Sequence, residues 1–131
     1  MKLSRMMLVM TMVMGLVLSG CSGYKKGEVL EELKPREAGT YAIHLFYEGV
    51  LPDSETTELN IFYNSTSELL KTMTIVQFWD QVQDRNVKWA KAIGVKQFPM
   101  YVVMDHDGIV LETPYLSQVE AFLTGAVLGE N

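Results

Sequence analysis

Residues Ala90 to Val110 read AKAIGVKQFPMYVVMDHDGIV, a stretch that predicts the end of a helix followed by a strand and a hairpin turn. Gly94 is placed to end the helix, because glycine readily adopts the left-handed conformation found after helix C-termini. The apolar run Met100–Met104 predicts a strand. Asp107-Gly108 is a tight-turn pair that should fold residues 109–113 back against that strand as a hairpin.

Two further strands are predicted upstream. Tyr41–Glu48 is apolar on both faces, which is typical of a central strand covered by helices on both sides. Met73–Trp79 predicts a second interior strand. Residues 49–58 read as a polar loop containing Pro52, and for residues 59–63 the pattern leaves a short strand and the start of a helix both open.

Three helices are predicted from their start signals. Asp84 is positioned to cap the helix that ends at Gly94. The capping-box patterns Ser65–Glu68 and Ser117–Glu120 each predict a helix start, the first for a short helix ending near Lys71. The helix that begins at Asp84 is expected to run through Val87, Trp89, Ala90 and Ile93. The last helix is expected to carry Val119, Phe122, Leu123 and Val127 on its inner face.

The order of these elements indicates an α/β fold. Two strands joined by a helical crossover imply a parallel pair, and the terminal hairpin adds antiparallel strands. The expected architecture is therefore a mixed sheet with helices on its faces.

This order resembles the thioredoxin fold over residues 40–125, and residues 89–113 carry the likeness. The family has the same succession of helix end, Gly-Val, proline, apolar strand and Asp-Gly turn. The resemblance implies a thioredoxin-like mixed sheet flanked by helices. It also implies that Pro99 is the family's cis-proline, with Phe98 before it.

One departure from the family is decisive for chemistry. Thioredoxins use a Cys-x-x-Cys motif after the first central strand, and its thiolate is the nucleophile. If Pro52 is placed on the family's active-site proline, Val50 and Asp53 occupy the two cysteine positions. The chain has one cysteine, Cys21. We therefore expect no thiol redox activity and no enzyme.

Cys21 belongs to a different motif. Lys2 and Arg5 are followed by the apolar run Met6–Leu18, which is too short for a membrane-spanning helix and is typical of a signal peptide. Leu18, Ser19, Gly20 and Cys21 resemble the lipobox of bacterial lipoproteins. The resemblance implies cleavage of signal peptide 1–20 and attachment of a diacylglyceryl group, with palmitate-type chains, to the Cys21 thiol. The alternative is an uncleaved membrane anchor with an incidental cysteine.

Residues 21–39 are predicted to be a lipid-anchored tether that precedes a domain at residues 40–131. The segment is polar and is interrupted by glycine and proline. As a flexible coil of about 18 residues, it would hold the domain roughly 20–25 Å from the lipid. The alternative is that Val29, Leu30 and Leu33 form a helical face that docks on the domain.

The charge balance excludes some partners. The full chain has a formal net charge of −5, and removal of Lys2 and Arg5 makes it more negative. Nucleic acids and anionic lipid surfaces are bound by clusters of lysine and arginine. We therefore expect no nucleic-acid partner, and membrane attachment through the lipid alone.

The remaining candidate residues favour structural roles. His44 is expected to be a buried, hydrogen-bonded core residue, and His106 a solvated turn residue. Asp105-x-Asp107-Gly108 has too few ligands for a calcium loop and is expected to be a hairpin turn. We predict no metal and no cofactor. Asn64–Thr66 fits a glycosylation sequon but reads as a helix start, Trp89 is expected to face the core, and Trp79 is the aromatic residue placed to line a site.

The sequence thus favours a binding or scaffold module anchored by lipid at the extracytoplasmic face of a bacterial cell membrane. Its partner would be an unidentified envelope protein or peptide, held in a groove near Val50, Asp53, Phe98 and Met100 by backbone pairing. Three alternatives stay open: a structural, peptidoglycan-associated lipoprotein without a groove, a thiol-independent enzyme of unknown substrate, and a subunit of a larger assembly.

Overall fold

The computed structural model describes residues 23–129. The predicted signal peptide, the lipobox and Cys21 lie outside the described residues. None of the described helices is both long and apolar enough to cross a membrane.

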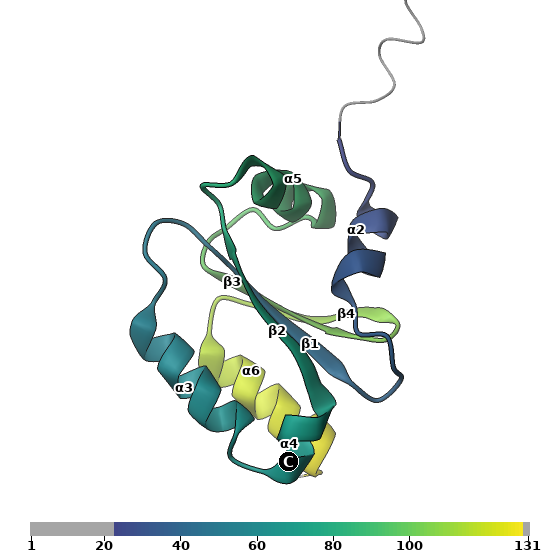
Figure 1. The fold of residues 1–131 in the computed structure, drawn as a ribbon, viewed down its shortest axis with the longest axis vertical. Coiled ribbons are helices and arrows are strands. Elements are labelled where there is room, and N and C mark those ends of the chain that lie inside the picture. Colours follow the sequence, from purple (N-terminus) through teal and green to yellow (C-terminus); the bar gives the residue numbers. More distant parts are fainter. Residues whose placement is uncertain (1–22, 130–131) are drawn as a thin grey trace, which may run out of the picture.

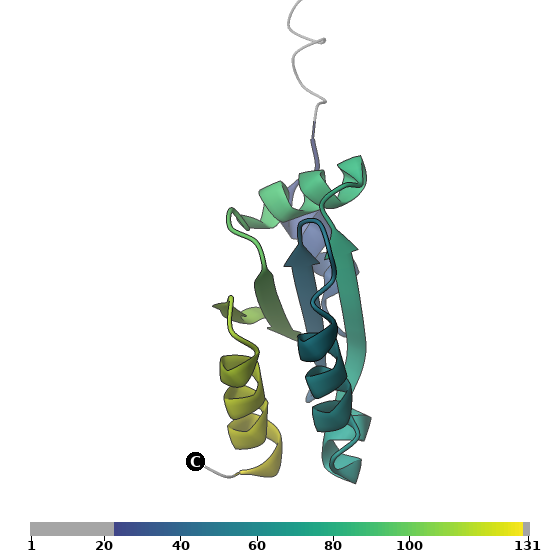
Figure 2. The same ribbon diagram turned by 90° about the vertical axis from the view of Figure 1, so that its left-hand side faces the viewer.

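A four-stranded mixed sheet forms the centre of the domain. Its strands are β1 (Tyr41–Tyr47), β2 (Met73–Asp80), β3 (Met100–Asp105) and β4 (Gly108–Thr113), in the spatial order β2-β1-β3-β4. β1 pairs with β2 in parallel and with β3 antiparallel, and β3 pairs antiparallel with β4. The predicted mixed sheet and terminal hairpin are confirmed. The prediction that 73–79 is an interior strand is wrong, because β2 forms an edge of the sheet (Figure 2).

Helices cover both faces of the sheet. α2 (Lys26–Leu33) and α5 (Asp84–Ile93) lie together on one face (Figure 1). α3 (Asp53–Tyr63), α4 (Ser67–Thr72) and α6 (Leu116–Leu123) lie on the other, where α6 continues into a π-helical turn, η1 (Thr124–Leu128). Each face has its own buried cluster, so the core forms two layers separated by the sheet.

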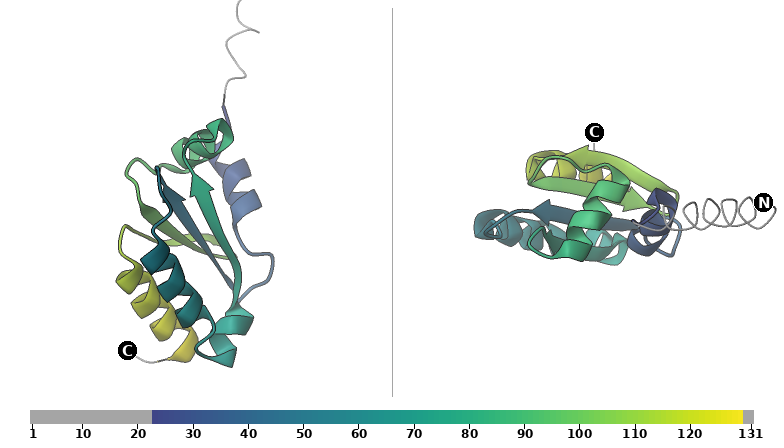
Figure 3. Two further views of the ribbon diagram at one scale, coloured as in Figure 1. Left: turned by 60° about the vertical axis from the view of Figure 1, so that its left-hand side comes forward. Right: turned by 90° about the horizontal axis from the view of Figure 1, so that it is seen from above.

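α2 forms part of the first layer. Val29 and Leu33 are each 1% exposed, and Leu30 is partly buried beside them. Spacings of three and four residues place these side chains on one helical face. For residues 26–33 the structure therefore corresponds to the docked alternative and not to a flexible tether. The described chain starts near α5, at the opposite end of the molecule from the end of α6 (Figure 3).

α3 replaces most of the loop predicted at residues 49–58. The helix begins at Asp53, and it includes residues 59–63, for which the sequence had left two alternatives open. Asp53 and Glu55 lie in its first turn, where carboxylates interact favourably with the helix dipole. Leu59 is buried and Phe62 partly buried three residues later, so one helical face packs on the sheet. The prediction of a loop for 53–58 is wrong.

The predicted helix caps are displaced. At α4 the cap is Thr66 rather than Ser65, since the Leu69 N–H donates to Thr66 Oγ1. At α6 the helix starts at Leu116, and Ser117 lies inside it. Asp84 is the first residue of α5, and Gln83 precedes it without a side-chain cap. The segment Asn64–Thr66 leads into α4, as the helix-start interpretation predicted, although Asn64 itself ends α3 and its amide donates to the Asn60 carbonyl oxygen.

The stretch from Ala90 to Thr113 follows its prediction closely. Gly94 ends α5 with φ +88°, a left-handed conformation that residues with a Cβ rarely adopt. The Val95 N–H donates to the Ala90 carbonyl oxygen at 2.8 Å, which closes the helix end. Asp105 Oδ1 accepts hydrogen bonds from the N–H groups of Asp107 and Gly108, so the predicted hairpin turn is confirmed.

Candidate functional site

The two loops predicted to line a peptide groove lie at the same end of the sheet. Met100, the first residue of β3, pairs with Phe46 near the end of β1. The loop that follows β1 therefore starts beside the loop that precedes β3 (Figure 1). The Phe98–Pro99 peptide bond is cis, as the resemblance implies.

The side chains of these loops point to different surroundings. Val50 is 87% exposed, and Asp53 is exposed at the start of α3. Phe98 and Met100 are partly buried against the cluster on the α2 and α5 face. Leu51 packs against the cluster on the opposite face. The exposed rim of this end of the sheet therefore includes Val50, Asp53 and Pro99.

His44 is the polar centre of the core, as predicted. It is fully buried in β1, and its Nε2 lies 2.8 Å from the Leu33 carbonyl oxygen at the end of α2. The Trp79 Nε1–H donates to His44 Nδ1 at 2.9 Å. Because the indole can only donate, Nδ1 must be the unprotonated nitrogen and Nε2 must carry the hydrogen. One neutral tautomer thus joins α2, β1 and β2.

The environment of His44 suppresses its protonation. Burial lowers the pKa of His44 from 6.5 to about 4, against the opposing effect of the hydrogen bond to the Leu33 carbonyl. The Trp79 N–H acts in the same direction as burial, since a proton on Nδ1 would face another donor. His44 is therefore a structural residue at neutral pH and is sealed from any substrate.

Trp79, the aromatic residue considered for a site, is committed to the core. It is 9% exposed and stacks on Phe46 with ring centroids 6.2 Å apart. The Arg85 guanidinium carbon lies 5.8 Å from its ring and 5.1 Å from the ring of Trp89. Trp89 in turn contacts Tyr24 edge to face. The cluster packs α5 and the start of the described chain against the sheet, and Trp79 itself is too buried to line an open site.

A second polar contact links β3 to α3. The buried Tyr101 donates from its hydroxyl to Glu55 Oε2 at 3.0 Å. Burial and the Glu55 carboxylate raise the pKa of Tyr101 above its ordinary value. Burial likewise raises the pKa of Glu120 on α6, with Glu58 adding to the effect. The Tyr101–Glu55 hydrogen bond therefore links α3 to the sheet, whereas Glu120 has no such partner among the described residues.

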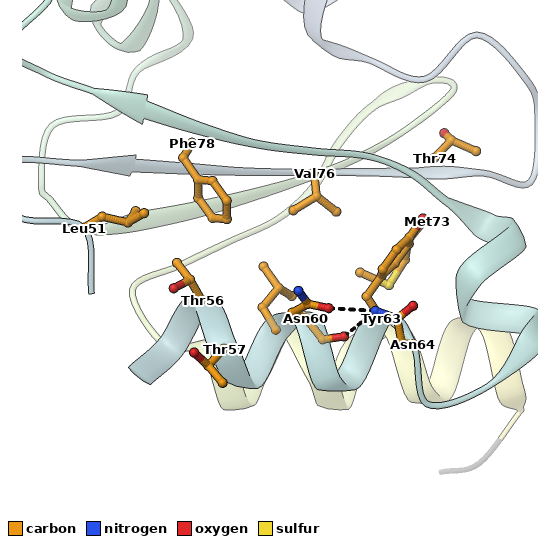
Figure 4. Close-up of a pocket in the computed structure, with 11 residues that line it drawn as sticks. Leu51, Thr56, Thr57, Asn60, Tyr63, Asn64, Met73, Thr74, Val76 and Phe78 are labelled. Carbon is orange, nitrogen blue, oxygen red and sulfur yellow. Dashed lines mark hydrogen bonds between the residues drawn. The ribbon is translucent and has the colours of Figure 1, made fainter. Parts of the chain in front are cut away.

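A cavity of about 600 Å³ between α3 and β2 was not predicted from the sequence. Val76 and Phe78 point from β2 toward α3, and Thr56 and Asn60 lie on the helix side (Figure 4). Its lining contains no charged side chain. The helix that forms one side of this cavity could have been predicted from the sequence. Leu59 and Phe62 have helical spacing and follow an acidic first turn, but the segment before them was predicted to be a loop.

The residues of the hairpin turn between β3 and β4 do not form a metal site. His106 is exposed in the hairpin turn, and the oxygen of Asp105 is occupied by backbone donors. Within residues 23–129 no group of three or more histidine, cysteine or acidic side chains could hold a metal ion.

The sequence matches no family model and no curated protein. The structure is similar to thioredoxin f2 of Chlamydomonas reinhardtii, with a TM-score of 0.55 and 13% identity, over 80% of this chain and 94% of that one. It is also similar to a thioredoxin-fold protein from Helicobacter pylori (TM-score 0.51, 15% identity, 76% and 80% covered). A third is thioredoxin of Malassezia sympodialis (TM-score 0.50, 11% identity, 82% and 88% covered).

These likenesses show a thioredoxin-like fold. Residues 48–52 join β1 to α3 at the place where the predicted resemblance puts the thiol motif, and they read Glu-Gly-Val-Leu-Pro. Cys21 is the single cysteine of the chain. The domain is thus a thioredoxin-like scaffold without a Cys-x-x-Cys motif.

Proposed function

We propose that this chain is a lipid-anchored, non-redox binding or scaffold module of the bacterial cell envelope, and not an enzyme. Cys21 would carry the lipid at the extracytoplasmic face of the membrane. The partner would be a protein or peptide of the envelope, and no cofactor would be needed.

One observation carries the proposal. The segment that follows β1 contains no cysteine, and Cys21, the single cysteine of the chain, precedes the thioredoxin-like domain, so this domain can form neither a catalytic thiolate nor a disulfide. The buried His44 is sealed from solvent, so it offers no general base in place of the thiol. What the domain does offer is exposed surface at the end of the sheet and along β2, which suits binding.

The lipid anchor makes the first prediction. In a bacterial host, the wild-type chain should be cleaved after Gly20, incorporate labelled palmitate and partition into a detergent phase. Cys21→Ser should abolish both labelling and cleavage, since the thiol is the acylated nucleophile. Ser22→Ala should leave both unchanged. An unlabelled, uncleaved wild-type chain would instead support the simple membrane anchor.

The loop surface makes the second prediction. Decapeptides selected from a random display library against the full chain serve as probes. Val50→Lys should weaken peptides that bind the exposed rim by about fivefold, because it replaces an apolar contact with a charge. Val87→Lys is the matched control, since Val87 is also an exposed valine but lies on α5. Equal affinities for both variants and the wild type would count against the loop surface.

A further inference from the structure

β2 has a free outer edge within the described part of the chain. The sheet order puts β2 at the end, and no described strand pairs with its outer side. The Gln81 N–H donates to the Tyr47 carbonyl oxygen at 2.9 Å. Because backbone groups alternate in direction along a strand, those of Gln77 and Trp79 also point to β1. Those of Val76 and Phe78 then point outward, away from the sheet.

From Ile75 to Trp79 this edge has none of the features by which proteins usually prevent strand pairing. Such features include charged side chains, proline and bulges along the edge. The segment from Met73 to Trp79 contains no charged residue, no proline and no glycine. The one irregularity in its pairing falls at the start, opposite Tyr41 and Ala42. From Ile75 onward the edge is regular and free of charge as far as Asp80.

The two sides of this edge differ in chemistry. On the α3 side lies the uncharged cavity of about 600 Å³ that contains Val76 and Phe78. On the α2 side a cavity of about 470 Å³ is bordered by Thr74 and Ile75 and by charged residues of both signs. The charged residues are Glu31, Glu32, Lys34, Arg36 and Glu37.

We propose that β2 is a docking edge for an extended segment of a partner protein, which adds a fifth strand to the sheet. Successive side chains of a strand point to opposite faces. The segment should therefore carry apolar residues at alternate positions, over the α3 cavity, and polar residues between them, over the α2 cavity. Backbone pairing with Val76 and Phe78 supplies the common part of the interaction. This inference rests on the proposed function, because it specifies the kind of protein segment that the proposed binding module would recognise.

A second copy of the chain fits this edge less well than a partner segment. Two β2 strands related by a two-fold axis would pair antiparallel. Tyr24 contacts Trp89 on α5, so the described chain starts at the end of the sheet where β2 ends. The two starts would then lie at opposite ends of the paired strands, about 26 Å apart for eight residues. The lipids of both copies could insert into one membrane only if the paired sheets lay parallel to the membrane surface.

The test uses the decapeptides selected against the full chain. Their sequences should show apolar residues with a period of two. Val76→Pro removes an outward N–H but leaves the bonds to β1, and it should weaken these peptides about tenfold. Phe78→Lys places a charge in the uncharged cavity and should have a similar effect. Ile61→Lys is the matched control, because Ile61 is 68% exposed on α3 and does not line the cavity.

Amide hydrogen exchange gives a second measurement that does not depend on the variants folding. Peptide binding should slow exchange at Val76 and Phe78, and leave Gln77 and Trp79, which already bond to β1, unchanged. Peptides that bind without protecting Val76 and Phe78, and that are lost only with Val50→Lys, would overturn the docking edge but keep the proposed function. The absence of any bound peptide would overturn both. A dimer that protects Val76 and Phe78 without peptide would assign the edge to a second copy instead.

Discussion

Lowering the pH from 7 to below 4 should remove about 3 kcal/mol from the free energy of unfolding through His44 alone. The folded-state pKa of His44 is about 4, whereas the unfolded chain titrates at 6.5. Between these values the unfolded state binds a proton that the folded state excludes. Falling pH therefore favours unfolding, and the contribution of His44 is complete above pH 6.5 and lost as the pH approaches 4.

The measurement is urea unfolding at a series of pH values, with His44→Gln as the test variant. Glutamine cannot titrate, so the loss between pH 6.5 and 4 should be smaller by about 1.4 kcal/mol per pH unit than in the wild type. His106→Gln removes the exposed histidine and should retain the loss due to His44. Comparison with a variant is needed because the raised pKa of Glu120 acts in the opposite sense. Parallel profiles for wild type and His44→Gln would contradict the prediction.

The sequence predicted the part of the fold that local chemistry determines. Gly94 and Asp107-Gly108 specify backbone conformations within a few residues of themselves, so the helix end and the hairpin could be placed in advance. The edge position of β2 could not, because strand order depends on pairing between distant segments. The apolar run from Met73 to Trp79 looks like a buried strand, yet Phe78 is 40% exposed beside a cavity.

The same distinction applies to the candidate site. The burial of His44 was predictable from its apolar neighbours in the sequence. Its partners were not, because Leu33 is 11 residues away and Trp79 is 35 residues away along the chain. The cavity beside β2 was not predicted because residues 53–58 are polar and were interpreted as a loop, so the helix that borders the cavity was not expected. Only the apolar residues Leu59 and Phe62, three positions apart, indicated a packed helix, and the structure shows the first buried and the second partly buried.

Leu33→Ala should lower the free energy of unfolding by about 3 kcal/mol, as expected for truncation of a buried leucine. Leu33 is 1% exposed where α2 packs on the sheet, and its carbonyl oxygen is bonded to His44. A leucine in a flexible tether would lose nothing on the same change. The measurement is urea unfolding at pH 7, where His44 is neutral.

Glu32→Ala is the control for helix propensity and charge, because Glu32 is exposed on the same helix and should change stability by less than about 0.5 kcal/mol. Equal stability of both variants would contradict the docking of α2.

If α2 is docked, the chain from Cys21 to Lys26 can extend only about 17 Å. A lipid on Cys21 would then hold the domain, and the end of β2, close to the membrane. Any partner segment that pairs with β2 would therefore have to bind close to the membrane, on its extracytoplasmic side.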